Sequence, residues 1–241
     1  MPQWLSLYCQ KKRRGKELSN ILITGSGKGL GLALSEELEN QGHNVFGFDL
    51  KDGDDVRFPG LSDLPEEIDV LINNAGVNII NWLDNFVESE WDMVMDTNAK
   101  GIYMMSKACL PMLIKSKGTI INIVSNAAHM PMTCSLAYNA SKGAAHIMTL
   151  QLARELTKKY GITVFGVAPN KMSGTGMSDS IDDQVVDTRG WTKEYAQEYQ
   201  LNGLLTGEET PPELLAGFIA YLLQDKTHHK FLTGCVLPYG A

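Results

Sequence analysis

The chain has 241 residues, of which 44% are hydrophobic and 20% charged, a composition that fits one globular domain with a substantial core. Its formal net charge of −7 argues against a nucleic-acid partner, because contacts to phosphates need clustered lysine and arginine. The four cysteines include no C-x-x-C pair, which indicates reduced thiols in a cytoplasmic protein. The histidines lack the spacing of a metal site. No apolar run reaches the roughly 20 residues that span a membrane.

The first residues form a segment of their own. Lysines and arginines cluster at 11–14, but no apolar stretch of signal-peptide length and no small-residue cleavage site accompany them. We therefore predict a poorly ordered tail over 1–18 and one folded domain over 19–241.

From residue 20 onward, short apolar runs alternate with amphipathic helical stretches. We predict strands at 20–24, 44–49, 69–74, 119–125, 162–168 and 235–238, and helices after a glycine-rich turn at 24–31 and over 84–115, 135–160 and 211–223, with turns near Asn98 and Gly101. This alternation indicates an α/β fold in which a doubly wound parallel sheet carries helices on both faces. The polar stretch 169–184 lacks periodicity, so we predict a long functional loop there, with a substrate loop at about 170–210.

The glycine-rich turn between the first strand and the first helix reads TGSGKGLG. Gly25, Gly29 and Gly31 permit a tight turn, close approach of the backbone to a phosphate, and packing of the helix on the strand. A pyrophosphate would then lie at the positive N-terminus of the helix.

The stretch SLAYNASK at 135–142 places Tyr138 and Lys142 four residues apart. On a helix the two share a face, with about 5–6 Å between their Cβ atoms. A phenol with a pKa of about 10 is a poor acid or base at neutral pH, but a nearby fixed cation favours the phenolate and lowers that pKa. The pair is a candidate proton donor, although this spacing alone is more often a packed tyrosine beside a solvated lysine.

Further motifs accompany this pair. N-N-A-G stands at 73–76, after the strand at 69–74, and Asn98 and Ser125 precede Tyr138 and Lys142. Together with T-G-x-x-x-G-x-G at 24–31, these motifs resemble the short-chain dehydrogenase/reductase family in order and spacing, over 20–241. The resemblance implies a single-domain Rossmann-like fold and an NAD(P)-dependent oxidoreductase that interconverts a carbonyl and a secondary alcohol.

The resemblance also implies roles for individual residues. Tyr138 exchanges a proton with the substrate oxygen, Lys142 lowers the pKa of Tyr138 and holds the nicotinamide ribose, Ser125 binds the substrate oxygen, and Asn98 holds a water that links the lysine to solvent. The cofactor-binding residues that it implies are Gly25, Lys28, Gly29, Leu30, Gly31, Asp49, Asp55, Val56, Asn74, Ala75, Gly76, Tyr138, Lys142, Pro169 and Met172; it implies no metal.

The connection between the second strand and N-N-A-G departs from the family's pattern. Asp49 to Asn73 spans only 24 residues (73 − 49), about half the usual length, so we expect the helix beside the family's third strand to be shortened or missing. We place the adenine-contacting pair of the family at Asp55 and Val56.

A second departure follows the strand at 162–168. The family has Pro-Gly there, whereas this chain has Pro169 and Asn170. Asparagine tolerates positive φ, so we expect the turn to survive. The next residues are one longer than the usual pattern, which leaves open whether Ser173 or Thr175 contacts the nicotinamide amide.

Two residues indicate different cofactors. Lys28 occupies a position where members that use NADP often carry a base, whereas Asp49, at the end of the second strand, is placed to bind the ribose 2′-hydroxyl and repel a 2′-phosphate. An exposed lysine swings into water at little cost, so we predict NAD over NADP.

The sequence does not specify the substrate. We expect a small-molecule carbonyl or alcohol, in a mostly apolar pocket lined by the loop at 170–200 and by Asn126, Ala128, His129, Met130 and Cys134. A 3-oxoacyl-thioester reductase and a small polyol or ketone dehydrogenase both remain open. A cofactor-binding regulator without turnover is a further alternative, which the complete Asn-Ser-Tyr-Lys set disfavours.

The helix at 135–160 carries apolar or small residues on more than one face, including Ala144, Ala145, Ile147, Met148 and Leu152. A helix that is apolar beyond its core-facing stripe usually buries the remainder elsewhere. We therefore predict a homotetramer or homodimer, with no membrane and no nucleic acid among its partners.

Overall fold

The strands form one parallel sheet. The computed structural model describes residues 18–62 and 64–240, so the tail predicted at 1–18 lies outside the described residues except for Leu18. The strands are β1 (Asn20–Thr24), β2 (Asn44–Phe48), β3 (Val70–Asn73), β4 (Thr119–Ile123), β5 (Thr163–Pro169) and β6 (Val236–Tyr239). Their order in the sheet is β2-β1-β3-β4-β5-β6, with every neighbouring pair parallel. The predicted α/β fold is confirmed.

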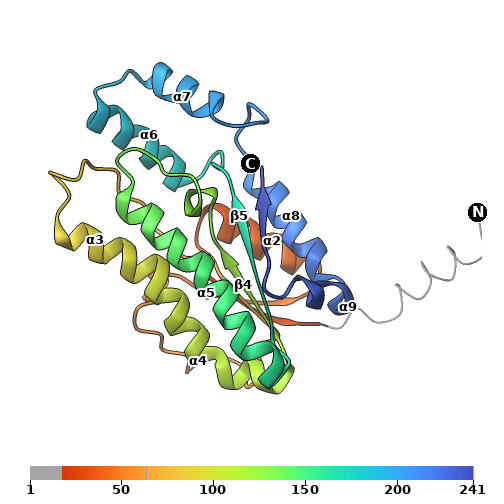
Figure 1. The fold of residues 1–241 in the computed structure, drawn as a ribbon. Coiled ribbons are helices and arrows are strands. Elements are labelled where there is room, and N and C mark those ends of the chain that lie inside the picture. The colour runs from red at the N-terminus through yellow and green to blue at the C-terminus, as the bar shows by residue number, and fades with distance from the viewer. Residues whose placement is uncertain (1–17, 63, 241) are drawn as a thin grey trace, which may run out of the picture.

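Helices cover both faces of the sheet (Figure 1). They are α2 (Gly29–Asn40), α3 (Glu88–Met95), α4 (Gly101–Ser116), α5 (Leu136–Tyr160), α6 (Gly176–Arg189), α7 (Lys193–Asn202), α8 (Pro212–Leu223) and the short α9 (Lys226–His229). A π-helical turn, Asp96–Lys100, joins α3 to α4, so the chain stays helical where the sequence predicted turns. Within 18–62 and 64–240, none of these helices combines the length and the apolar composition needed to cross a bilayer.

Side chains of the central strands alternate between two helical layers. Ile21 and Ile23 of β1 belong to the cluster formed with α2 and α8, whereas Leu22 between them belongs to the cluster formed with α4 and α5. Each is fully buried. This is the pattern of a sheet covered on both faces, where period-2 alternation sends successive side chains to opposite layers.

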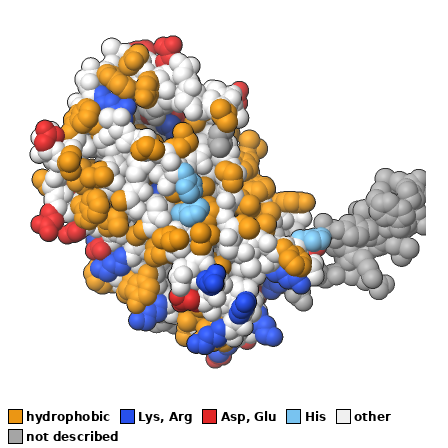
Figure 2. All heavy atoms as spheres, viewed as in Figure 1, with side chains coloured by type: hydrophobic (Ala, Val, Ile, Leu, Met, Phe, Trp, Pro, Cys, Tyr) orange, Lys and Arg blue, Asp and Glu red, His pale blue; other side chains and the backbone are white. Residues whose placement is uncertain are grey.

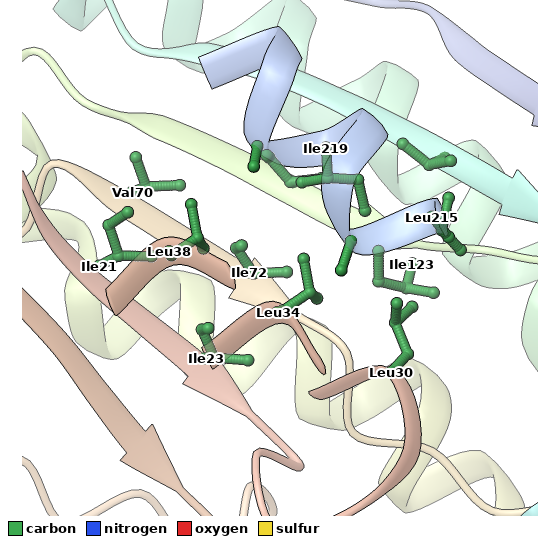
Figure 3. Packing of buried hydrophobic residues seen from close by; sticks show 14 of the residues in the cluster. Ile21, Ile23, Leu30, Leu34, Leu38, Val70, Ile72, Ile123, Leu215 and Ile219 are labelled. Atoms are coloured by element: carbon green, nitrogen blue, oxygen red, sulfur yellow. The ribbon is translucent and has the colours of Figure 1, made fainter. Parts of the chain in front are cut away.

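The position of α2 follows from its apolar stripe. Leu30, Leu34 and Leu38 recur every four residues, so they lie on one face of the helix and pack on the sheet beside Leu215 and Ile219 of α8 (Figure 3). This packing brings the N-terminus of α2 to the carboxyl end of β1, where the glycine-rich turn lies.

The prediction of a long loop at 169–184 is wrong, because much of that stretch is helical. Thr175 caps α6 by accepting a hydrogen bond from the Ser178 amide at 3.1 Å. The helix buries only a narrow apolar stripe, with Val185 packed against Ile80 and Cys134. Most of α6 is therefore polar, and the hydrophobic periodicity that would reveal a helix is weak in this part of the sequence.

The connection between β2 and β3 contains only a 3-10 turn, Leu50–Asp52, among its described residues. The expectation that a helix is shortened or missing here is therefore confirmed. No described strand follows β2 at this side, so β2 pairs with β1 alone and forms one edge of the sheet.

One face of α5 packs on the sheet, and another is exposed. Ala145 is fully buried, whereas Leu136 is 49% and Ile147 60% exposed. Hydrophobic side chains also lie over the neighbouring helices on this side of the molecule (Figure 2). Such a surface fits the predicted self-association, which stays a prediction.

Leu34→Ala tests the packing of α2 on the sheet. Leu34 is fully buried, whereas Leu32 of the same helix is 42% exposed. Because a cavity replaces the lost methyl groups, we expect Leu34→Ala to lower the free energy of unfolding by about 2–5 kcal/mol. Leu32→Ala is the matched control, with an expected change within about 0.5 kcal/mol. Chemical denaturation measures both, and equal losses would contradict this packing.

Candidate functional site

A groove of about 600 Å³ follows the carboxyl ends of the strands. Its wall includes Gly25 after β1, Phe48 of β2, Asn74 after β3, Ile123 of β4 and Pro169 of β5. In open parallel sheets, ligands bind in the crevice outside these ends, where the strand order reverses. Here the reversal falls between β1 and β3.

Most of the predicted site residues lie in the wall of this groove. They are Gly25, Lys28, Gly29, Leu30, Asp49, Asp55, Val56, Asn74, Ala75, Gly76, Ser125, Tyr138, Lys142, Pro169 and Met172. Gly31 and Asn98 lie behind the wall. Lys51, Arg57 and Val77 also line the groove, and sequence reasoning did not single them out. Met177 lines it too, within the loop predicted at 170–200.

The glycine turn leaves room for an anion beside its backbone. Gly25 and Gly29 have φ of 67° and 54°, a region that favours glycine. A Cβ on Gly31 would lie 2.0 Å from the Gly25 carbonyl oxygen, so a larger residue cannot occupy this position without displacing the turn. The first turn of α2 carries no acidic side chain and no side-chain cap, so its amides and the positive end of the helix are available to a phosphate.

Hydrogen bonds lock the end of β1 to the end of β3. The Thr24 hydroxyl oxygen accepts from the amides of Asn74 and Ala75, both at 3.0 Å. The Asn74 side-chain amide donates to the carbonyl oxygens of Thr24 at 3.0 Å and Gly25 at 3.1 Å. These bonds hold N-N-A-G against the glycine turn.

Two backbone amides fix the carboxylate of Asp49. Gly27 donates to Oδ2 at 2.8 Å and Lys51 to Oδ1 at 3.0 Å. A Cβ on Gly27 would lie 2.9 Å from Asp49 Cγ and 2.7 Å from Lys51 Cδ, so both side chains border the glycine turn. Among the described residues, Asp49 forms no ion pair with either Lys51 or Lys28.

Arg57 holds the carboxylate of Asp55, the predicted adenine-contacting residue. Its Nε lies 2.9 Å from Oδ1 and its Nη2 2.6 Å from Oδ2, a bidentate arrangement. The hydrogen bond from Arg57 lowers the pKa of Asp55. Val56 is buried against Gly101. A cation directly after an acid–apolar pair is the signal that could have identified Arg57.

Ser125, Tyr138 and Lys142 come together at the ends of β4 and α5. Ser125 hydrogen-bonds the Tyr138 hydroxyl, while burial raises the pKa of Tyr138 above its ordinary value. Lys142 donates to the Ile123 carbonyl oxygen at 2.9 Å, and its Nζ lies 5.7 Å from the centre of the Tyr138 ring. Burial lowers the pKa of Lys142 to about 8.

The predicted lowering of the Tyr138 pKa by Lys142 is therefore wrong for this structure. Desolvation of the phenol is the larger effect, and the hydrogen bond from Ser125 opposes it. The ammonium of Lys142 donates a hydrogen bond to the Ile123 carbonyl oxygen, and burial lowers the pKa of Lys142 itself to about 8.

The side chain of Asn98 forms hydrogen bonds both to the segment after N-N-A-G and to α5. Its Nδ2 donates to the Val77 carbonyl oxygen and its Oδ1 accepts from the Val77 amide, both at 2.8 Å. It also donates to Ser141 Oγ at 3.0 Å, and Ser141 donates to the Tyr138 carbonyl oxygen. The side chain of Asn98 thus ties the segment after N-N-A-G to α5, and its predicted water-holding role stays a prediction.

The segment after β5 differs from its prediction in one respect and bears on one alternative that the sequence left open. Asn170 has no positive φ; its amide donates to the Tyr239 carbonyl oxygen at 3.0 Å, and Thr210 donates to its Oδ1 at 2.6 Å. Of the two residues left open, Thr175 rather than Ser173 lines the groove, where its Cγ2 would lie 3.2 Å from a Cβ on Gly29.

The residues after β4 that were predicted to line the substrate pocket, including Cys134, do not line this groove, so their role stays a prediction. The predicted loop at 170–200 does line it, through Met172 and Met177, and Val77 contributes a further apolar side chain. Cys134 packs with Ile80 beneath α6. The other residues of this prediction, Asn126, Ala128, His129 and Met130, lie outside the groove because the chain turns away at a 3-10 turn over Asn126–Ala128.

Comparison with known proteins gives consistent matches. A family model described as short chain dehydrogenase matches residues 61–186. Sorbitol-6-phosphate 2-dehydrogenase of Klebsiella pneumoniae is 30% identical over 247 residues, which cover 89% of this chain and 91% of that protein. The 3-oxoacyl-(acyl-carrier-protein) reductase FabG of Staphylococcus aureus strain N315 is 30% identical and covers 91% of this chain and 95% of its own.

Solved structures share the fold. Ligand-free aldohexose dehydrogenase of Thermoplasma acidophilum has a TM-score of 0.79 at 23% identity and covers 92% of both chains. A variant of actinorhodin polyketide ketoreductase, solved with NADPH, has a TM-score of 0.78 at 23% identity and covers 93% of this chain and 96% of its own.

Lys142→Met tests the buried ammonium. Folding lowers the pKa of Lys142 from 10.5 to about 8, so between these values the unfolded chain binds a proton that the folded chain lacks. The free energy of unfolding of the wild type, minus that of Lys142→Met, should therefore be lowest below pH 8. It should rise by about 3 kcal/mol between pH 8 and pH 10.5. Urea unfolding without cofactor measures this difference, with Lys158→Met, an exposed position of α5, as the control. A difference independent of pH would contradict the assignment.

Proposed function

The chain belongs to the short chain dehydrogenase family, and on that premise we propose that it interconverts a carbonyl group and a secondary alcohol with a nicotinamide dinucleotide. The observation that carries the proposal is the meeting of Ser125, Tyr138 and Lys142 in the wall of a groove that begins at the glycine turn. A regulator without turnover would not require an acid held in this way.

The groove fits a dinucleotide. The pyrophosphate site is the turn at Gly25–Gly31, where a Cβ on Gly31 would collide with the backbone and the start of α2 is free of acidic side chains. Asp49 would accept a hydrogen bond from the adenosine ribose, and Asp55 and Val56 would border the adenine. When bound, the nicotinamide supplies or accepts the hydride.

Tyr138 would supply the proton, and Ser125 would help to orient the substrate oxygen. In the reductive direction, Tyr138 would donate its hydroxyl proton to the carbonyl oxygen while the carbonyl carbon gains the hydride. Ser125 would donate to the same oxygen as charge develops on it. Burial raises the pKa of Tyr138, so at neutral pH the phenol carries the proton that it would donate.

The proposal includes a preference for NAD over NADP. Two backbone amides hold the Asp49 carboxylate in place, so it cannot turn away from a 2′-phosphate as easily as an unrestrained side chain would. Lys28 is exposed and Lys51 lies beside Asp49, so the two lysines soften the repulsion without removing it. A cytoplasmic location accords with the free thiols of Cys109, Cys134 and Cys235.

Tyr138→Phe tests the proposed acid. The variant keeps the ring and loses the hydroxyl, so we expect turnover to fall by roughly 10²–10⁴ while NADH binding persists. Tyr160→Phe, at the other end of α5 and outside the groove, is the matched control. Steady-state rates and NADH fluorescence measure the two effects. Turnover close to that of the wild type would rule out Tyr138 as the acid.

Asp49→Ser tests the cofactor preference. We expect the wild type to favour NADH over NADPH by about 10-fold in kcat/KM, which corresponds to about 1.4 kcal/mol, and Asp49→Ser to narrow or reverse this ratio. Asp52→Ser removes the same charge from an exposed position in the adjacent 3-10 turn and should leave the ratio unchanged. A wild type that already favours NADPH would show that Asp49 does not face the ribose.

A further inference from the structure

The chain leaves the sheet after β5 and returns to the same place before α8. The Thr210 amide donates to the Lys171 carbonyl oxygen at 2.9 Å, and the Ser173 amide donates to the Thr210 carbonyl oxygen at 3.1 Å. Between these two ends lie α6 and α7, which pack on each other at one end of the molecule (Figure 1). The segment 174–209 is therefore a closed excursion from the sheet, which we call the α6–α7 arm.

The start of the α6–α7 arm forms part of the groove. Thr175, Gly176 and Met177 lie in the groove wall. Thr175 Cγ2 would lie 3.2 Å from a Cβ on Gly29, and Lys28 Nζ would lie 4.0 Å from a Cβ on Gly176. The arm therefore meets the glycine turn at the groove, so its position decides how much room a ligand has there.

Few apolar contacts hold the arm in place. Val185 of α6 and Ala196 of α7 are the buried apolar residues of the described segment 174–209, and both belong to a small cluster with Ile80. Gln184 accepts from the Ile80 amide at 2.8 Å, and Thr188 donates to the Ile80 carbonyl oxygen at 3.3 Å. These contacts hold α6 to the segment after N-N-A-G, but they do not tie the arm to β5.

A buried lysine supplies the connection to β5. Lys171 Nζ lies 2.5 Å from Asp182 Oδ1 of α6 and 2.9 Å from Glu209 Oε1 at the end of the arm. The side chains of Lys171, Asp182 and Glu209 are 14%, 12% and 22% exposed. Gln200 of α7 donates to the same Asp182 oxygen at 3.0 Å. One ammonium thus joins the segment after β5 to both helices and to the returning chain.

Loss of this ammonium would disturb the arm. Burial removes water from charged groups, and close opposite charges offset that cost only while every partner is present. Without the ammonium of Lys171, the carboxylates of Asp182 and Glu209 would face each other without a cation, so α6 would shift to let water reach them. Because Met177 belongs to the same helix as Asp182, this shift would reach the groove wall.

We propose that Lys171 is a positioning residue of the groove, which keeps the start of α6 in the groove wall by holding Asp182 and Glu209. Lys171 is not itself part of that wall, so it acts through the arm and touches neither cofactor nor substrate. The proposal rests on the proposed function. It predicts weaker binding with little effect on proton transfer, because the catalytic residues lie at the ends of β4 and α5 and outside the arm.

Lys171→Met tests the proposal. We expect the Kd of NADH and the KM of a ketone to rise by about 10-fold or more, with kcat within about 3-fold of the wild-type value. NADH fluorescence gives the Kd, and ethyl acetoacetate and acetoacetyl-coenzyme A are the ketone probes, one for each substrate class that the sequence leaves open. Hydrogen exchange should become faster over α6 and stay unchanged over α5.

Lys193→Met is the matched control. Lys193 of α7 lies 3.7 Å from Asp183 of α6, so it also pairs the two helices, but the side chains of Lys193 and Asp183 are 62% and 72% exposed. An exposed ion pair contributes little, so Kd, KM and the exchange of α6 should keep their wild-type values.

Two further variants separate the charge from the side chain that carries it. Asp182→Asn removes the partner charge with almost no change of shape and should raise the same two constants; it carries the test if Lys171→Met does not fold. Lys171→Arg keeps a cation that can bind two carboxylates, so we expect it to restore both constants to within about 3-fold of the wild type.

Failure of the inference and failure of the proposed function are distinguishable. A folded Lys171→Met or Asp182→Asn variant that loses stability but keeps the wild-type Kd and KM would overturn the inference, as would a fall in kcat at unchanged Kd and KM. A wild type that binds NADH but reduces neither ketone would contradict the proposed function. In that case the NADH Kd and the exchange of α6, which need no turnover, still decide the role of Lys171.

Discussion

The site depends on the hydrogen bonds that join Thr24 to Asn74 and Ala75. β1 and β3 are neighbours in the sheet although 45 residues separate their ends (70 − 24 − 1), and the strand order reverses at this boundary. The Thr24 hydroxyl accepts from two amides, and the Asn74 side chain donates to two carbonyl oxygens of the glycine turn. Because these groups are largely shielded from water, each lost partner would leave a polar group unsatisfied. The glycine turn, N-N-A-G and the start of α2 therefore keep one arrangement before any ligand binds.

Burial shifts the pKa values of Tyr138 and Lys142 in opposite directions. It disfavours the charged form of each, so the pKa of Tyr138 rises and that of Lys142 falls to about 8. The two values move apart, because the pKa of Tyr138 starts at 10.0 and rises whereas that of Lys142 starts at 10.5 and falls, so the phenol keeps its proton at a pH at which the amine loses its own. Ser125 acts against this trend at the phenol, while the Ile123 carbonyl oxygen stabilises the ammonium.

Residues next to strands and in dense motifs were the most predictable. Short apolar runs located the six strands of the described residues, and the glycine turn, Ser125, Tyr138 and Lys142 were identified by their resemblance, in order and spacing, to the motifs of the family. The helix at Gly176–Arg189 was missed because its apolar stripe is narrow. Arg57 and Val77 were missed because they reach the groove through tertiary contacts that no local pattern records. The pKa of Tyr138 was predicted in the wrong direction because spacing reveals a neighbouring charge but not the loss of water.

The short connection after β2 also affects how the protein behaves at high concentration. Within the described residues, β2 bonds to β1 on one side only, and an open strand edge is a template for adding strands from other molecules. β2 has five residues, includes Gly47 and ends next to Asp49, after which Lys51, Asp52 and Asp54 follow. A short strand, a glycine and a run of charges all discourage such addition. The charged turn after β2, which borders the groove, is thus expected to discourage edge-to-edge association as well.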